Sequence, residues 1–369
     1  MIYQKCGKVP YINTVHKNVM NLKKSEVNAL YQNISEAECI IPVGEGRSQC
    51  ALYIGLRNIK RDVKMIEAID FPGENMYEAA EILEKKYKKI SLLVNSGSGE
   101  TTNPKRVVEE LKSYIDKSGS DSFTIDSVVS NPDSSIGKVS KEYGSTVILE
   151  GRGPEVEIGI KFMQHGIMND IYELGSLMLF HEIREMVNSN GNENIFDEMD
   201  RDTKDICGFI DNFVGSDTYN SLIDNMEKRG HVIVGGTGIA RVAALMSVIR
   251  FQHVKRAIGD EAYLTGSLAP RPRAGDTVIL VSWSGENETL MKWMKESKRF
   301  GANVYSITGR KSTLSDNTDS FVLPSDPSEF YMKAAFVLSP ISLSLVDRLD
   351  SRGLKLPEYI MGWYHSVTQ

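Results

Sequence analysis

The feature that most constrains this sequence is a pattern that occurs in both halves of its 369 residues. An apolar run passes directly into a turn rich in glycine and serine, and a helix-like segment follows. The run Ile90–Val94 leads into Asn95–Asn103, and the run Thr277–Val281 leads into a turn that reads SWSGENET. A short apolar run before such a turn is typical of a buried parallel strand that connects to a helix. The copies lie about 190 residues apart, far beyond any solenoid period, so the sequence predicts a duplicated domain.

Strand-like and helix-like segments alternate within each half, and this alternation predicts an α/β fold. Each half is expected to form a doubly wound parallel sheet flanked by helices, a flavodoxin-like three-layer sandwich. The polar segment Asn188–Asn194 is the predicted linker, which divides the chain into domains 1–189 and 190–369. The expected strands are Cys39–Val43, Val63–Ile69, Ile90–Val94, Phe123–Val129, Thr146–Leu149, His231–Val234, Thr277–Val281, Ala302–Ile307 and Ser320–Leu323. Helices are expected over about residues 14–34, over Met76–Tyr87 and from Gly166 to Asn188.

Composition and charge exclude several classes of protein. The formal net charge is −6 and the sequence shows no basic stripe, which argues against a nucleic-acid partner. We find no apolar run of roughly 18 residues and no signal-peptide core, so no membrane partner is expected. The cysteines are dispersed and without a pairing pattern, which fits a cytoplasmic protein. Neither the cysteines nor the histidines show metal-ligand spacing, and no metal is expected. The residues considered are Cys6, Cys39, Cys50, Cys207, His165, His181 and His365.

Two nucleotide-binding patterns are compared with the glycine-rich turns. The P-loop pattern GxxxxGK[ST] is absent from the sequence. The dinucleotide pattern GxGxxG matches in part at Gly44 and Gly46, but Gln49 stands where its third glycine belongs. Glu67 follows at a suitable distance for a ribose partner. A nicotinamide or flavin cofactor is therefore the minor alternative, and no cofactor is expected.

A phosphate monoester fits the turn at Asn95–Asn103 better. The turn lies at the start of a helix, where backbone N–H groups and the positive end of the helix dipole favour an anion. Three hydroxyl groups add donors, and two glycines allow the backbone to approach a ligand closely. A second hydroxyl-bearing turn, Gly44–Ser48, follows the first strand of the same half and argues against the alternative, a helix cap without a ligand. The residues of the first turn are Ser96, Ser98 and Thr101, with Gly97 and Gly99.

These motifs make the whole chain resemble the sugar isomerase (SIS) domain proteins, with one SIS domain in each half. Both halves look most similar to the 6-phospho-3-hexuloisomerases, whose pattern reads GxGRS, a helix and then SGSGET. The first half carries Gly46–Ser48 and Ser96–Thr101 intact, whereas the second half has Gly238–Ala240 and Ser282–Asn287 in their places. The last of these also resembles the SYSGNT stretch of the archaeal phosphoglucose/phosphomannose isomerases, which contain two SIS domains.

The resemblance implies an enzyme that isomerises a hexose 6-phosphate, aldose to ketose or ketose to ketose, through an enediol. Its partner would be a small phosphorylated sugar. Because single-SIS isomerases assemble as tetramers, a chain with two SIS domains is expected to form a homodimer. The phosphate group would be held by Gly46, Arg47, Ser48, Ser96, Gly97, Ser98 and Thr101.

The resemblance also assigns the proton transfers to a glutamate in the closing helix and a histidine that follows the first βα unit. Glu173 matches this glutamate in the first half, while Met332 stands at the corresponding place in the second. A gapless count puts the histidine at His253 in the second half and reaches Arg61 in the first. Each half thus keeps a different part of the site. We therefore expect a single site per chain, with Glu173 as the enediol base and His253 as the ring-opening residue.

Structural roles are the alternative for each charged side chain. Glu173 would then be an exposed or capping glutamate, and His253 would favour the negative end of a helix dipole. Arg47 would form a salt bridge with Glu45 or Glu100. The two tryptophans Trp283 and Trp293 are expected in the core rather than as a platform for a sugar ring.

Two other functions stay open at this point. One is a sugar-phosphate sensor that binds its ligand without chemistry. The other is an aminosugar-phosphate deaminase or isomerase, a branch in which the tail carries a lysine where this chain has His365. Proton exchange at a sugar carbon would separate the enzymes from the sensor.

Overall fold

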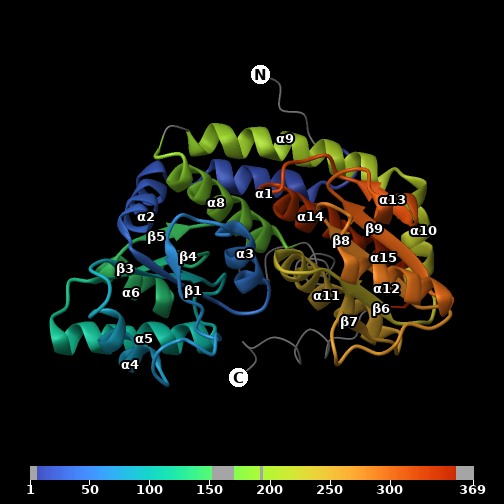
Figure 1. The fold of residues 1–369 in the computed structure, drawn as a ribbon. Coiled ribbons are helices and arrows are strands. Elements are labelled where there is room, and N and C mark those ends of the chain that lie inside the picture. The colour runs from blue at the N-terminus through green and yellow to red at the C-terminus, as the bar shows by residue number, and fades with distance from the viewer. Residues whose placement is uncertain (1–5, 152–169, 192–193, 355–369) are drawn as a thin grey trace. The chain divides into compact units, whose positions relative to one another are not determined.

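The computed structural model describes residues 6–151, 170–191 and 194–354 (Figure 1). Contacts divide these residues into two compact units. The N-terminal unit contains residues 14–151, 171–191 and 194–200, and the C-terminal unit contains residues 6–13, 170 and 201–354. The division predicted at 189/190 differs from these units, because it assigns residues 6–13 to the first half and residues 194–200 to the second.

The N-terminal unit contains a five-stranded parallel sheet in the order β2-β1-β3-β4-β5. Its strands are β1 (Cys39–Gly44), β2 (Asp62–Val63), β3 (Ile90–Asn95), β4 (Phe123–Val129) and β5 (Thr146–Ile148). Every residue of β1 and β3 is buried, as their continuous apolar runs predict. The register pairs Gly44 with Asn95, so the carboxyl ends of β1 and β3 lie side by side.

Helices cover both faces of this sheet. They are α2 (Lys24–Glu36), α3 (Arg47–Gly55), α4 (Met76–Leu83), α5 (Thr102–Ser118), α6 (Ser135–Tyr143) and α8 (Ile171–Asn188), while α1 (Tyr11–Met20) and α9 (Ile195–Val214) have residues in both units. On one face α4 packs on α5, and on the other α3 packs along α8 (Figure 1). Side chains of β1, β3, α4 and α5 form one hydrophobic cluster. The turns that follow β1 and β3 are therefore held on a packed framework.

The C-terminal unit repeats this architecture, with a parallel sheet in the order β7-β6-β8-β9-β10. Its strands are β6 (Val232–Gly235), β7 (Ala262–Leu264), β8 (Thr277–Ser282), β9 (Asn303–Thr308) and β10 (Asp319–Val322). Its helices are α10 (Asp217–Glu227), α11 (Ile239–Ala257), α12 (Glu288–Arg299), α13 (Thr313–Asp316), α14 (Phe330–Leu338) and α15 (Pro340–Ser351). The strand order matches that of the N-terminal unit element by element. The predicted α/β class with two parallel sheets is confirmed.

Three predicted boundaries are wrong. The helix expected over about residues 14–34 is divided into α1 and α2 by a turn at residues 21–23. The strand expected over Val63–Ile69 pairs only at Asp62–Val63, and side chains of α3 bind Glu67 beyond it. The helix expected over Met76–Tyr87 ends at Leu83. Local sequence patterns do not show where tertiary contacts or turns end an element, so the predicted elements are longer than the observed ones.

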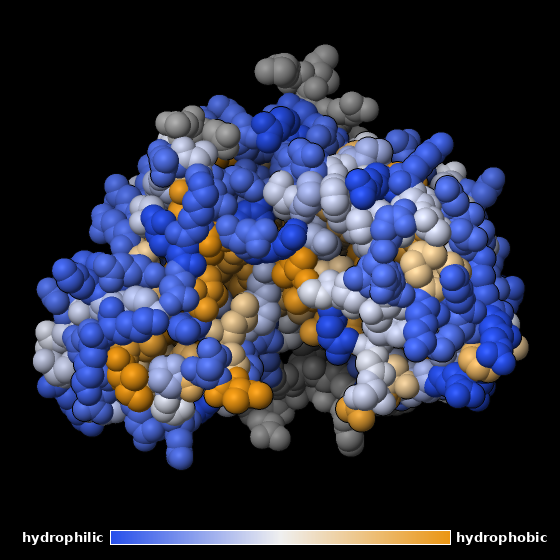
Figure 2. Space-filling view, in the orientation of Figure 1, coloured by the Kyte–Doolittle hydropathy of each residue, from blue (hydrophilic) through white to orange (hydrophobic). Residues whose placement is uncertain are grey.

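One apolar stretch, Phe330–Ser351, is long and apolar enough to cross a membrane by composition, although none was expected. It corresponds to α14 and α15, which meet at Ser339 and Pro340. Of its most apolar window 78% is buried inside the protein, as in a core helix. The face drawn in Figure 2 is largely hydrophilic, with hydrophobic residues in separate patches.

Candidate functional site

The first turn of the candidate site connects β1 to α3. Gly46 is the N-cap residue of α3 and has φ +58°, a left-handed conformation that glycine adopts without strain. Arg47 and Ser48 then form the first turn of the helix, and the Arg47 side chain is buried. A buried guanidinium at the start of a helix adds positive charge where the helix dipole is also positive. This turn is suited to an anion.

The second turn connects β3 to α5 and is shaped by its own hydroxyl groups. The Ser96 hydroxyl oxygen accepts from the Gly99 N–H at 3.2 Å and lies 3.0 Å from the Thr101 hydroxyl oxygen. The Ser98 hydroxyl oxygen accepts from the Glu100 N–H at 3.2 Å. Gly99 has φ +67°, and a Cβ atom there would lie 2.0 Å from the Ser134 hydroxyl oxygen. Glycine is therefore required at this position on two independent grounds.

The amino end of α5 begins directly after these hydroxyl groups. Thr101 is its N-cap residue, and within the described residues its side chain makes no cap bond to the helix. The first turn of α5 carries no acidic residue. The N–H groups of a first helical turn need partners from outside the helix, and a ligand anion can provide them.

The Glu100 carboxylate, considered above as a salt-bridge partner of Arg47, has other partners in the structure. It accepts from the Ser135 N–H and hydroxyl and pairs with Lys105 at 3.1 Å. Partial burial opposes ionisation, but the hydrogen bonds from Ser135 and then Lys105 outweigh it and lower the pKa of Glu100. Through its hydrogen bonds with Ser135, the carboxylate connects the turn to α6.

A buried network joins the two turns to the start of α8. The Asn95 amide donates to the Ser48 carbonyl oxygen at 2.9 Å and to the Ser176 hydroxyl at 3.0 Å. The Tyr172 hydroxyl donates to the Asn95 side-chain oxygen at 2.7 Å. Glu173, the next residue, is buried in the first turn of α8. The two turns and the base predicted at Glu173 are therefore connected within one unit.

Three members of this network were not predicted from the sequence: Asn95, Tyr172 and Ser176. The signal for Asn95 was available, because it is a polar residue at the end of an otherwise apolar strand that is buried throughout. Buried polar side chains need hydrogen-bond partners, and such partners often organise a site. The bonds of Tyr172 and Ser176 depend on how α8 packs, which local sequence does not indicate.

The carboxylate of Glu67 is also close to the first turn. It accepts from the Gln49 amide and, at 2.7 Å, from the Tyr53 hydroxyl. Burial first, and then the Glu67 carboxylate, raise the pKa of Tyr53. The two α3 side chains thus engage the carboxylate considered as a ribose partner.

The predicted His253 lies in the C-terminal unit, buried on α11. One turn before it, Arg250 pairs with Asp170 at 2.7 Å, and both side chains are buried. In the N-terminal unit α3 ends at Gly55, so Arg61 lies beyond the helix, where its guanidinium donates to the Lys60 and Ser35 carbonyl oxygens. The gapless count therefore matches a helical position with a loop position. The role of His253 stays a prediction.

The C-terminal unit repeats the second turn almost bond for bond. The Ser282 hydroxyl accepts from the Gly285 N–H at 3.1 Å, and the Ser284 hydroxyl accepts from the Glu286 N–H at 3.3 Å. The difference is at Asn287, whose side-chain oxygen accepts from the Leu290 N–H at 3.2 Å and caps α12. An acidic residue, Glu288, follows in the first turn. Both features disfavour an anion there.

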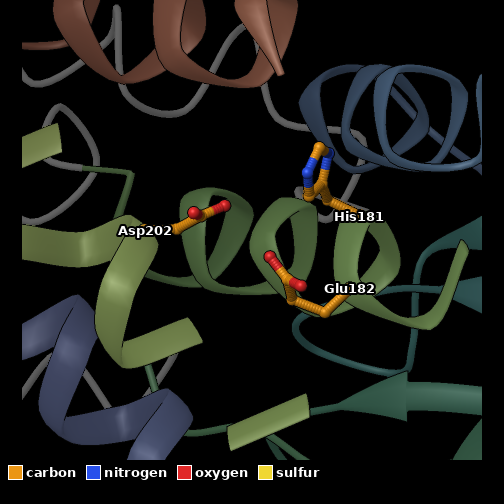
Figure 3. Close-up of side chains that lie close together, drawn as sticks. All are labelled: His181, Glu182 and Asp202. Carbon is orange, nitrogen blue, oxygen red and sulfur yellow. The ribbon is translucent and has the colours of Figure 1, made fainter. Parts of the chain in front are cut away.

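Figure 3 shows His181, Glu182 and Asp202, three described residues of types that bind metal ions. His181 and Glu182 lie on α8 of the N-terminal unit, and Asp202 lies on α9 beyond the unit boundary. The Arg184 guanidinium contacts the His181 ring, with 3.0 Å between Nη2 and Nδ1. A fixed positive charge beside this ring opposes a second cation. We assign no metal centre to these residues.

Comparisons with known proteins agree with this architecture. No protein-family model matches the chain. It is 26% identical over 106 residues to the 3-hexulose-6-phosphate isomerase of Methylomonas aminofaciens, a match that covers 28% of this chain and 56% of that protein. The chain thus spans about half the length of this curated relative.

Two solved structures extend the likeness over both units. The C-terminal domain of glucosamine-fructose-6-phosphate aminotransferase from Francisella tularensis matches with TM-score 0.57, 15% identity and coverage of 94% of this chain and 96% of that one. The tagatose-6-phosphate ketose/aldose isomerase of Escherichia coli matches with TM-score 0.56, 11% identity and coverage of 91% and 90%. The chain has the double-SIS fold. At these identities the structures establish the fold and leave the activity to the residues of the site.

Proposed function

We propose that the protein is a phosphosugar isomerase that acts on a hexose 6-phosphate through an enediol. The phosphate group binds at the amino ends of α3 and α5, with donors from Arg47, Ser48, Ser96, Ser98 and Thr101. The observation that carries this proposal is the α5 amino end, where the hydroxyl groups are arranged but the Thr101 side chain does not cap the helix. The 3-hexulose-6-phosphate isomerase and the tagatose-6-phosphate isomerase to which the chain is similar support the same ligand class.

In this proposal Glu173 is the base. Its carboxylate takes the proton from the carbon beside the sugar carbonyl, and the electrons of that C–H bond form the carbon–carbon double bond while the carbonyl oxygen takes a proton to give the enediol. The carboxylate then returns its proton to the former carbonyl carbon as the other hydroxyl loses its proton, so the carbonyl moves by one position and no cofactor is consumed. The buried position of Glu173 and its link to the turns through Asn95 and Tyr172 support this role.

The test is a panel of hexose and hexulose 6-phosphates in deuterated water. Wild-type protein is expected to incorporate solvent deuterium into one of them, and Glu173→Gln is expected to slow incorporation by about 10²–10⁴-fold. Glu109→Gln, an exposed change on α5, is the matched control and should exchange like wild type. Equal exchange by Glu173→Gln would remove Glu173 from its role, and binding without exchange in wild type would identify a sensor.

Other expectations from the sequence stay predictions. A slower isomerisation of cyclic substrates by His253→Asn, with open-chain analogues unaffected, would support the ring-opening role. The homodimer and the cytoplasmic location are likewise predictions, and sedimentation and cell fractionation would test them.

A further inference from the structure

The two units differ in the connection that crosses from the edge strand to the central strand. In the N-terminal unit, residues 64–89 join β2 to β3 and include α4. In the C-terminal unit, residues 265–276 join β7 to β8 without a helix. A cavity of about 490 Å³ lies beside this shorter connection. Its size is in the range of pockets that bind small ligands or a few side chains of a partner.

In the N-terminal unit, α4 packs on a defined set of residues. Its apolar side chains recur at helical spacing and join the same hydrophobic cluster as residues of β1, β3 and α5. At its amino end, the Met76 N–H donates to the Glu110 carboxylate at 2.9 Å. This carboxylate therefore binds one of the N–H groups that a helix start leaves without an internal partner. The residues of α4 are Met76, Ala79, Ala80 and Leu83, and those around it are Ile41, Leu92, Val107 and Leu111.

The cavity is lined by the counterparts of these surrounding residues. The strand register pairs Ile233 with Val278 in the same way as Ile41 with Leu92. Aligning Ser282 with Ser96 then places Trp293, Ser297 and Glu296 of α12 at the positions of Val107, Leu111 and Glu110. All five C-terminal residues line the cavity. The place that α4 fills in one unit is thus a cavity in the other.

Two further observations concern the residues at this cavity. Leu268, between the lining residues Ser267 and Ala269, is 95% exposed, so a partner that covers the cavity would also bury this aliphatic side chain. The Thr265 hydroxyl lines the cavity, is buried and has no hydrogen-bond partner among the described residues. A buried hydroxyl without a partner is costly and is expected to find one when a ligand binds.

We propose that this cavity is a docking site for a short amphipathic helix of a partner protein. The apolar face of that helix packs on Ile233, Val278 and Trp293, and the edge of this face contacts Leu268. Its amino end lies at Glu296, whose carboxylate complements the positive end of a helix dipole as Glu110 does for α4. This helix-in-groove mode gives affinity through apolar residues at i, i+3, i+4 and i+7. The site does not depend on the isomerase chemistry.

The probe is a peptide of residues 74–86 with α4's own sequence. Because isolated helices of this length are marginal in water, a lactam joins Glu81 and Lys85, which are both exposed in the protein. With a fluorescent label, it is expected to bind the full-length protein in the micromolar range. Glu296→Lys is expected to weaken binding about tenfold. Glu288→Lys, at another exposed glutamate of α12, is the matched control and should bind like wild type.

A photoreactive group at the Met76 position of the peptide locates the contact. Crosslinks to α12 around Trp293 support the proposal. Crosslinks confined to α5 would show exchange with α4 in the N-terminal unit and overturn it. Absence of binding, equal binding by Glu296→Lys, or a crystal structure with a small molecule in the cavity that the peptide cannot displace would overturn it as well.

Discussion

The helices α5 and α12 start from the same turn in the two units, yet their amino ends are chemically different. Both turns use two serine hydroxyls to accept backbone N–H groups, and both contain a glycine with positive φ. In the N-terminal unit Thr101 leaves the helix start available, whereas in the C-terminal unit Asn287 caps it. A duplicated turn therefore keeps its geometry while the residues at the helix start change what it can bind.

The largest effect is expected from the buried ion pair of the C-terminal unit. Arg250→Met leaves Asp170 buried without this partner, and we expect the free energy of unfolding to fall by about 3–5 kcal/mol. The exposed pair Arg106–Glu110 of the N-terminal unit is the comparison, and Arg106→Met should cost about 0.5 kcal/mol. Urea unfolding of both variants measures this. Similar losses in the two would contradict the assigned difference in burial.

Alanine at the two glycines of the N-terminal turns separates steric from conformational strain. Gly99→Ala adds a Cβ against Ser134, which also caps α6, and should cost about 3 kcal/mol of stability. Gly46→Ala meets no atom within 4 Å and should cost about 1–2 kcal/mol, from its positive φ alone. Thermal unfolding distinguishes them. If Gly46→Ala is the more destabilising change, the close contact at Gly99 is not what requires glycine.

Exchanging the residues at the two helix starts tests the comparison directly. Thr101→Asn introduces the cap of the C-terminal unit, and we expect the affinity for inorganic phosphate to fall by about 1.5–3 kcal/mol, roughly ten- to hundredfold. Asn287→Thr should leave the original affinity unchanged. Isothermal titration of both variants provides the measurement. If Thr101→Asn bound phosphate as tightly as wild type, the proposed location of the anion site would be wrong.

The smallest expected effect concerns alkaline pH, where the units respond with opposite sign. In the C-terminal unit, burial lowers the pKa of Lys255 to about 8, against 10.5 in an unfolded chain, although Asp260 opposes the shift. Between these values the unfolded state binds more protons, so this lysine makes stability rise with pH. In the N-terminal unit, burial raises the pKa of Cys50 to about 12, against 9.0 unfolded. Its contribution is complete below pH 9 and is lost as pH rises toward 12.

Urea unfolding at pH 8 and pH 10 checks these signs. Between pH 8 and pH 10, Lys255 raises the free energy of unfolding of the wild type by about 1–2 kcal/mol, and Lys255→Met should lack this rise. Cys50 lowers the free energy of unfolding by a similar amount over the same range, and Cys50→Ala should lack this decrease. The change with pH is compared rather than the absolute stability, because both substitutions also alter packing. Profiles parallel to wild type in both variants would show that neither group titrates in this range.

Most of the candidate site could be predicted from local sequence, because its chemistry is concentrated in two short turns. Ser96, Ser98 and Thr101 stand together in the sequence and lie together in the structure. The network through Asn95, Tyr172 and Ser176 could not be predicted in the same way. It joins residues almost 80 positions apart, and their meeting depends on how α8 packs against the sheet.

The sequence by itself determined the alternation of strands and helices, the duplication and the two hydroxyl-bearing turns, because apolar periodicity and turn chemistry act over a few residues. Only the tertiary structure decided the strand order, the close approach of Ser134 to Gly99, and where the absence of an α4 counterpart leaves a cavity. Each of these depends on contacts between segments distant in the chain. The cavity exists because the connection over residues 265–276 crosses the sheet without a helix.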